Sequence, residues 1–239
     1  GNQNLTAIVD VSYNKVNGVM KGSYREVIAG DVNLAYRLNT KFLFRNIMSI
    51  TSNRSDDSPY GDFSEYATMN PYFSPYDKSG EITKDNNNPM YNATLNTKRT
   101  SGYLEFTNNF YTEYSILDGL KAVARIGITS QNSTGDIFYP ANHTKFSDWT
   151  DDRFLRRGSY QQNTGKYTNL NGDLTIQYSK TFDKHLLMAN FAFSISEKKN
   201  SEVVHYAEGF PSDRMDDITF ALQYAENKTP YGNESITRD

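Results

Sequence analysis

Apolar and polar residues alternate with a period of two along seven stretches of the chain. A β-strand has this period, because its successive side chains point to opposite faces of the sheet. In each stretch, aromatic and aliphatic side chains fall on one face, and charged and amide side chains fall on the other. The predicted strands are residues 5–13, 24–37, 41–52, 102–114, 119–130, 167–179 and 185–196.

The alternation is clearest in residues 24–37. One face of this strand carries Tyr24, Ile28, Val32, Leu34 and Tyr36, and the other carries Arg25, Asp31, Asn33 and Arg37. Three residues, Glu26, Asn46 and Asn108, break the rule because they fall on the apolar faces of their strands. Alternation of this kind predicts one dry and one wet face, as in a membrane barrel or in a soluble β-sandwich.

The connections between the predicted strands are short and long in turn. The short ones are residues 38–40, 115–118 and 180–183, and the long ones are approximately 53–101, 131–166 and 197–239. An up-and-down antiparallel meander places all short turns at one end and all long loops at the other. Outer-membrane barrels have this asymmetry, whereas soluble domains seldom contain structureless loops of such length.

Aromatic rings and central charges also favour a barrel in a membrane. Rings on the apolar faces gather near both strand ends, where a ring is stable half in lipid and half in water. An Arg or Lys facing lipid costs ~2–4 kcal/mol at mid-membrane, and the central charged residues all take the opposite face. The rings are Tyr13, Tyr24, Tyr36, Phe42, Tyr114 and Tyr178, and the central charges are Asp31, Arg125 and Asp173.

The composition agrees with a wet, all-β architecture. The 239 residues include 18 Tyr and 14 Phe, which suit half-buried strands, although only 37% are hydrophobic and the mean hydropathy is -0.71. A net charge of -3 gives no reason to expect a nucleic-acid partner, and no cysteine is present for a disulfide. The chain starts without a signal peptide and ends in a polar stretch, so we expect residues 1–239 to be a fragment of a longer barrel.

Five motifs resemble the barrel of SusC/RagA-like TonB-linked outer-membrane proteins. Each motif is short, but their order and spacing extend along nearly the whole chain. The motifs are Tyr24-Arg25-Glu26 with Asn33-Leu34-Ala35-Tyr36-Arg37, Asn70-Pro71-Tyr72-Phe73-Ser74-Pro75-Tyr76-Asp77, Asn88-Pro89-Met90-Tyr91-Asn92-Ala93, Asn108-Asn109-Phe110-Tyr111 through Gly119-Leu120-Lys121, and Glu208-Gly209-Phe210-Pro211-Ser212-Asp213-Arg214-Met215.

This resemblance implies a large plugged barrel in the bacterial outer membrane, and transporters of that kind have about 22 strands. It implies import of bulky nutrients, glycans or peptides, with a SusD-like surface lipoprotein as partner and with energy supplied through TonB. The plug and the TonB contact are expected elsewhere in the whole protein, because residues 1–239 contain neither. No cofactor is implied.

The long loops are expected to face the substrate. Aromatic faces together with Asn and Asp side chains suit recognition of sugars or peptides by stacking and hydrogen bonding. The candidates are Trp149, which is the only Trp, Tyr60, Tyr72 and Tyr76, with Asp62 and Tyr66 near them. The alternative for each is packing of loop against loop. The residues expected to line the interior of the barrel are Arg25, Arg37, Glu105, Lys121, Arg125 and Asp173.

Two other classes of function remain as alternatives. One is a soluble β-sandwich that binds carbohydrate through loop aromatics. The other is a surface hydrolase that uses a carboxylate pair, although glycosidases need two carboxyls ~5–9.5 Å apart and adjacent loop residues seldom converge in that way. The pairs are Asp56-Asp57, Asp151-Asp152 and Asp216-Asp217. We expect no catalytic residue and no metal site, since the three histidines are widely spaced.

Overall fold

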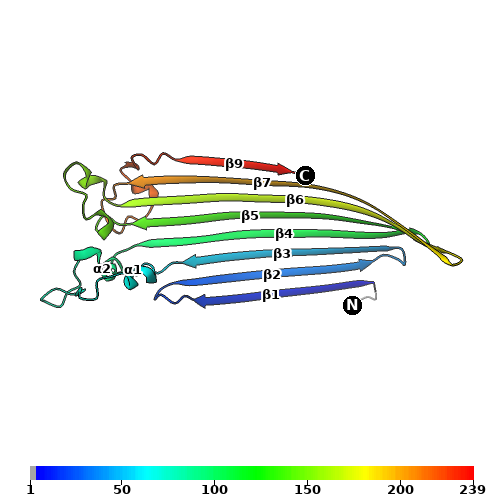
Figure 1. Cartoon of the computed structure of the whole chain (residues 1–239), viewed down its shortest axis with the longest axis horizontal. Helices are drawn as coiled ribbons and strands as arrows, with labels where there is room; N and C mark the ends of the chain where they lie inside the picture. Colours follow the sequence, from blue (N-terminus) through cyan, green and yellow to red (C-terminus); the bar gives the residue numbers. More distant parts are fainter. Residues whose placement is uncertain (1–3) are drawn as a thin grey trace.

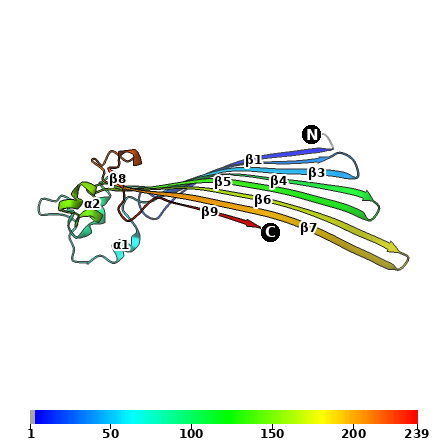
Figure 2. The same cartoon turned by 90° about the horizontal axis from the view of Figure 1, so that it is seen from above.

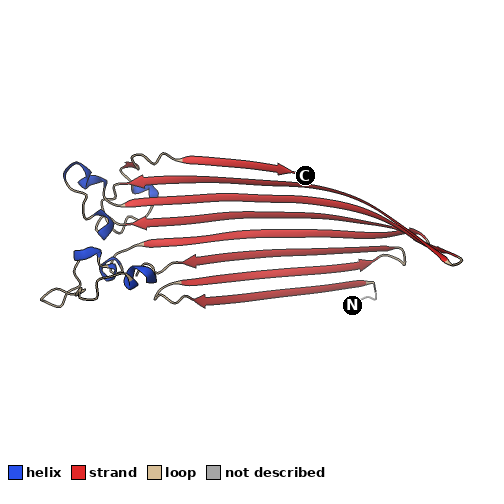
Figure 3. Cartoon of the chain, viewed as in Figure 1, coloured by secondary structure: helices blue, strands red, loops and turns tan. Residues whose placement is uncertain are grey.

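The computed structural model describes residues 4–239, and nearly all of its regular structure belongs to one antiparallel sheet (Figure 1, Figure 3). Seven long strands lie side by side in chain order, and two shorter strands, β8 and β9, both pair with β7. The strands are β1 (Leu5–Asn17), β2 (Tyr24–Arg37), β3 (Phe42–Asp56), β4 (Lys98–Leu117), β5 (Leu120–Tyr139), β6 (Ser159–Phe182), β7 (His185–Glu208), β8 (Gln223–Tyr224) and β9 (Tyr231–Arg238).

The long loops gather at one end of the sheet, together with the short β1–β2 connection 18–23, and the other short turns lie at the opposite end (Figure 1). Seen from above, the sheet is curved and does not close on itself (Figure 2). The predicted up-and-down meander, an unclosed part of a barrel wall, is confirmed. No helix within residues 4–239 is long and apolar enough to cross a membrane. The short helices all lie in the loops: α1 (Phe63–Ala67), η1 (Asp85–Asn87), α2 (Pro89–Asn92), η2 (Thr144–Phe146), η3 (Asp151–Arg156) and η4 (Ile218–Phe220).

The β-sandwich alternative is wrong, because the described strands form one sheet and have no second sheet packed against them. A sandwich would bury Leu34, Phe106 and Ile126 together. These side chains are 39%, 37% and 56% exposed, respectively. The large apolar side chains of the sheet therefore lie on an open surface, which requires a covering other than this chain.

The predicted loop bounds were wrong, because the strands continue well beyond the apolar segments at the loop end. The expected loops 53–101, 131–166 and 197–239 contract to 57–97, 140–158 and 209–230, the last interrupted only by β8. In the first part of β6, residues 159–166, every residue except Tyr160 is polar or glycine, so hydrophobic alternation is absent there although backbone pairing continues. Strand β9 was missed for the same reason.

The strand register assigns the alternating positions to two continuous faces. The apolar face, as we call it, includes the row Val9, Val32 and Met48, whose residues are direct neighbours on β1, β2 and β3. It continues across the sheet through Phe106, Phe110, Ile126, Leu170, Leu174, Phe193 and Ile195. The predicted interior residues all share the opposite, polar face: Arg25, Arg37, Glu105, Lys121, Arg125 and Asp173.

Two pairs of opposite charges lie on the polar face. The Nζ of Lys121 lies 2.8 Å from Glu113, and the Nε of Arg125 lies 3.9 Å from Asp173. Tyr111 donates a 2.7 Å hydrogen bond to Glu113, and its ring lies beneath the guanidinium of Arg125. Such pairing is what a hydrated interior surface permits, and it would be costly on a surface that faces hydrocarbon.

Asn46 and Asn108, which depart from the alternation on the apolar face, hydrogen-bond to each other. Asn46 Nδ2 donates to Asn108 Oδ1 over 2.9 Å, and Asn108 Nδ2 donates to Asn46 Oδ1 over 3.2 Å. They lie diagonally across β3 and β4, since the direct partner of Asn46 is Phe110. Reciprocal bonding satisfies part of each amide, so the pair is tolerated where a single amide would be left without partners.

We predict that removing one amide of this pair costs more than removing both. The single change Asn108→Leu leaves Asn46 unpaired and is expected to destabilise the barrel by about 1–3 kcal/mol. The double change Asn46→Leu with Asn108→Leu is expected to be nearly neutral. Urea unfolding of the complete barrel measures both, and a double variant at least as unstable as the single one would contradict the prediction.

Candidate functional site

A cavity of about 340 Å³ lies at the loop end of β5, β6 and β7, and we call it the rim pocket. Its floor is formed by residues of these strands that share the polar face, Ile137, Gln161, Tyr206 and Glu208. Its roof is the 140–158 loop, and one wall is the segment 225–228. The roof contributes Lys145, Phe146, Trp149, Arg153 and Arg156, and the wall contributes Glu226 and Lys228.

Local hydrogen bonds and packing hold the roof in place. His143 begins η2, and its Nδ1 accepts a 3.0 Å hydrogen bond from the backbone N–H of Lys145. Asn92 and Thr144 exchange two hydrogen bonds of 2.7 and 3.0 Å, which join the 57–97 loop to the roof. Phe146 is buried, and its ring meets that of Trp149 edge to face at 5.1 Å. The roof is therefore a folded part of the surface, with Trp149 fixed at its inner side.

Arg156 binds both carboxylates of the rim pocket. Its Nε lies 2.6 Å from Glu208, which is 3% exposed, and its Nη1 lies 2.6 Å from Glu226. Glu208 also accepts a 2.8 Å hydrogen bond from Gln223 of β8. These bonds satisfy a buried carboxylate that would otherwise be costly, and they anchor η3 to the end of β7.

The structure brings together two of the four aromatic residues proposed from sequence. Trp149 lines the rim pocket, and Tyr60 lines an adjoining cavity of about 200 Å³ that shares Tyr139 and Lys145 with it. Tyr72 and Tyr76 line a separate hollow in the 57–97 loop. Sequence reasoning missed Lys145, Arg153, Arg156 and Lys228, because no local pattern separates them from ordinary solvated loop cations.

The surroundings of Tyr72 and Trp149 also differ. Tyr72 is 94% exposed, so its ring packs on very little. The ring of Trp149 contacts Phe146 and lies near the guanidinium groups of Arg153 and Arg156, at 5.7 and 5.9 Å. Trp149 therefore packs against other loop residues, which was the alternative considered for every candidate. It also lines the rim pocket.

Residues of two of the three carboxylate pairs have structural partners. Asp56 and Asp57 lie 3.6 and 3.4 Å from the guanidinium groups of Arg54 and Arg99. Asp217 begins η4 by accepting a 2.9 Å bond from the backbone N–H of Thr219. Within residues 4–239, no group of three His, Cys, Asp or Glu side chains is placed to hold a metal ion.

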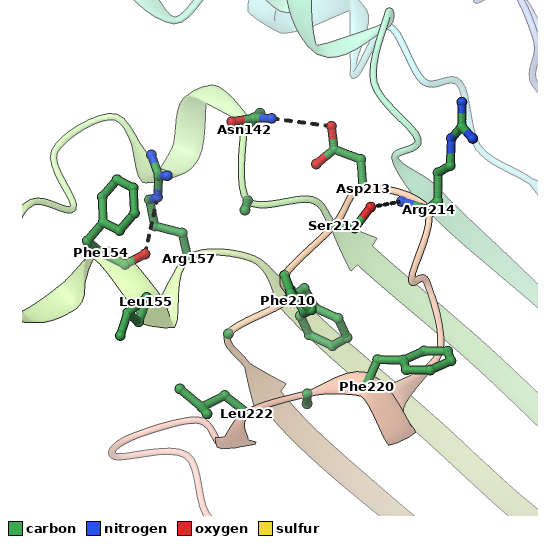
Figure 4. Close-up of a pocket in the computed structure, with 14 residues that line it drawn as sticks. Asn142, Phe154, Leu155, Arg157, Phe210, Ser212, Asp213, Arg214, Phe220 and Leu222 are labelled. Carbon is green, nitrogen blue, oxygen red and sulfur yellow. Dashed lines mark hydrogen bonds between the residues drawn. The ribbon is translucent and has the colours of Figure 1, made fainter.

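A second and larger cavity, of about 990 Å³, opens on the other side of the roof (Figure 4). Phe210 forms part of its wall and packs edge to face on Phe138 of β5 at 5.1 Å. Phe138 shares the apolar face of the sheet, so this cavity lies on the apolar side of the sheet at its loop end. Phe154, Leu155 and Leu222 line it and are more than half exposed.

The roof should loosen as the pH falls. Burial, with added repulsion from Lys145 and Lys84, lowers the pKa of His143 from 6.5 to about 4. The folded roof thus favours the neutral ring, whose Nδ1 accepts the Lys145 N–H, and protonation removes that acceptor. A folded-state pKa below the unfolded one gives stability that is complete above pH ~6.5 and is lost as the pH falls toward ~4.

Hydrogen exchange of residues 143–147, corrected for intrinsic rates, measures this effect. We expect more opening at pH ~5 than at pH ~7.5 in the native chain. His143→Asn keeps a capping acceptor but removes the titration, so its opening should not depend on pH over this range. Equal pH dependence in both chains would contradict the role given to His143.

One apolar and one polar face, turns at one end and folded loops at the other define part of the wall of a large membrane barrel. The solved structures with this fold include the RagAB peptide importer in its closed-closed state and in its open-open state, each 17% identical with a TM-score of 0.75. A further structure of the RagAB peptide transporter is 16% identical with a TM-score of 0.76. All of this chain aligns, and it covers 27% of each matched chain.

Neither a family model nor a curated protein matches the sequence. At 16–17% identity, the structural likeness establishes the fold, and the fold is that of a SusC/RagA-like barrel segment, as the sequence motifs indicated. This chain therefore spans about a quarter of the length of each chain that it matches.

Proposed function

We propose that this chain is a wall segment of a TonB-dependent importer of bulky nutrients in the bacterial outer membrane. The observation that carries the proposal is the division of the sheet into an apolar face and a charged polar face that contains two ion pairs. The apolar face would contact lipid, and the polar face would line the interior and contact a plug supplied by the rest of the protein. The chain performs no bond chemistry, and its work is gated passage.

The proposed cargo is a peptide or a glycan, delivered with the help of a SusD-like surface lipoprotein. Support for the peptide comes from the likeness to the RagAB peptide importer, and support for a bulky cargo comes from the size of the folded loop end. The rim pocket lies at the mouth of the barrel on the polar face, where an entering ligand would pass. The larger outer cavity faces away from that route.

Spin labels on the complete protein in lipid test the central assignment. The sequence contains no cysteine, so single cysteines can be introduced into it without a competing thiol in this segment. Labels at Leu34→Cys and Ile126→Cys are expected to be accessible to oxygen dissolved in lipid. Labels at the adjacent positions Asn33→Cys and Arg125→Cys should be accessible to a water-soluble nickel complex. Labels at Leu34 and Ile126 that report a dry protein interior would refute the proposal.

Transport has a separate readout. Cells that depend on this protein for uptake of a peptide or a glycan should lose that uptake when TonB is deleted, with the barrel still present in the outer membrane. Deletion of the proposed SusD-like surface lipoprotein should reduce uptake at low cargo concentration. Uptake that continues without TonB would overturn the energy-coupled mechanism, whatever the spin labels report.

A further inference from the structure

The rim pocket contains more positive charge than its own residues neutralise. Four cations line it, Lys145, Arg153, Arg156 and Lys228, against two carboxylates, Glu208 and Glu226. Arg156 is the cation that forms the ion pair with each of these carboxylates. Neither Lys145, Arg153 nor Lys228 has an ion-pair partner within 4.0 Å among residues 4–239.

Aromatic rings hold the unpaired ammonium groups in place. The Nζ of Lys145 lies 4.3 Å from the ring centre of Tyr139, and the Nζ of Lys228 lies 5.1 Å from that of Tyr206. Arg153 lies over Trp149 and donates to the backbone carbonyl oxygen of Asp148. Cation–π contacts fix a cation without neutralising it, so the charge remains available to a ligand.

The surroundings of Lys145 strengthen the stabilisation that a bound anion would give to its ammonium group. Burial lowers the pKa of this ammonium, and the nearby ammonium of Lys228 lowers that pKa further. Both lysines are exposed residues, but the Lys145 ammonium is partly desolvated, and a negative group placed between the two ammonium groups stabilises them. The interaction is stronger there than at the open surface, because water screens it less.

We propose that the rim pocket binds a carboxylate group of the imported ligand, with Lys145 and Lys228 as its charged partners and Trp149 and Arg153 as the adjoining wall. The proposal rests on the proposed import function and narrows its cargo to acidic molecules. A cavity of about 340 Å³ is at the small end of ligand sites, ~300–1,000 Å³. It therefore fits one acidic residue or one sugar unit and not the whole cargo.

Two sources of carboxylate fit this chemistry, an acidic peptide and a uronate oligosaccharide. The test uses one matched pair of probes for each source, with the complete transporter purified in detergent. The first pair is a blocked hexapeptide containing two glutamates and the same peptide containing two glutamines. The second is trigalacturonate and its methyl ester. Titration calorimetry at low ionic strength gives the affinity ratio within each pair.

The native transporter should bind the charged member of at least one pair about 10-fold more tightly than its neutral counterpart, as expected for a charge-assisted contact. The pair that shows this ratio identifies the source. Lys145→Met with Lys228→Met keeps much of each side chain but removes the charge, and its ratio should fall to about 2 or less. Lys145→Arg with Lys228→Arg should retain a clear preference.

Lys78→Met is the matched control, since Lys78 is an exposed lysine of the 57–97 loop that lines neither the rim pocket nor the cavity beside it. It should leave the ratio unchanged. Equal binding of the charged and neutral probes in both pairs, or an undiminished preference in the double Met variant, overturns the proposal. If TonB-dependent uptake persists in that case, only the pocket assignment fails. If a folded barrel supports no such uptake, the proposed function fails as well.

Discussion

Replacing Val32 with arginine is expected to lower the stability of the inserted barrel sharply, whereas the same change at the next residue, Asn33, is expected to be tolerated. Val32 lies in the apolar row between Val9 and Met48, near the middle of β2. An arginine facing lipid at that depth costs ~2–4 kcal/mol. Native proteins are stable by only ~5–15 kcal/mol, so this is a large fraction of the total.

Asn33→Arg is a close control, because the two positions have the same depth and the same strand and differ in the face they occupy. On the polar face an added arginine meets water and other charged groups, so we expect a cost below ~1 kcal/mol. The measurement is the folded fraction in the outer membrane, from heat-modifiable mobility on gels, with urea unfolding for the free-energy difference. An equal loss of folded barrel in both variants would mean that the two sides of the sheet contact the same environment.

The apolar segments of the strands could be predicted because each side chain in them belongs to either the apolar or the polar face, which gives an alternating sequence. Residues 24–37 were predicted with both ends correct, since polar and apolar residues alternate along β2 except at Glu26. Beyond the apolar segments, polar residues occur on both faces and the sequence no longer alternates. Residues 159–166 and 231–238 pair as strands there, held by backbone hydrogen bonds that side-chain pattern does not reveal.

The loop motifs were recognised from sequence, but their roles became clear only in the structure. Asn88 begins α2 by accepting from the N–H of Met90, and its Nδ2 donates to the carbonyl oxygens of Pro75 and Thr83. Gly209 has a φ of 79°, and a Cβ there would lie 2.6 Å from Leu222 Cβ. These residues shape the loops, so a motif of Asn, Pro and Gly indicates a loop scaffold and gives no direct sign of a ligand.

The charged residues of the rim pocket could not be predicted from the sequence, for a different reason. Lys145 and Lys228 belong to separate loops, and they line one cavity only because β5 and β7 both flank β6 and end at the same rim. Each lysine by itself is an ordinary exposed loop residue. Trp149 could be proposed because it is the single Trp of the chain, whereas its charged neighbours had no comparable signal.

Replacing Phe138 with alanine is expected to release the 209–222 segment from the outside of the wall. Phe138 is fully buried at the loop end of β5, where it packs with Tyr160 and Phe210, and Ile218 and Ala221 of the same segment complete the cluster. Truncating a fully buried Phe costs about 3–5 kcal/mol. If most of that loss falls on docking of this segment, its open population rises by at least ~100-fold.

Trypsin cleavage after Arg214, an exposed residue of that segment, reports the open population when opening and closing are fast. The rate in the Phe138→Ala variant should rise steeply, while the membrane-embedded strands stay resistant. Phe220→Ala is the control, because Phe220 lies in the same segment but is 50% exposed and should cost little. A similar rise in the cleavage rate of both variants would show that contacts other than the cluster around Phe138 hold the 209–222 segment against the sheet.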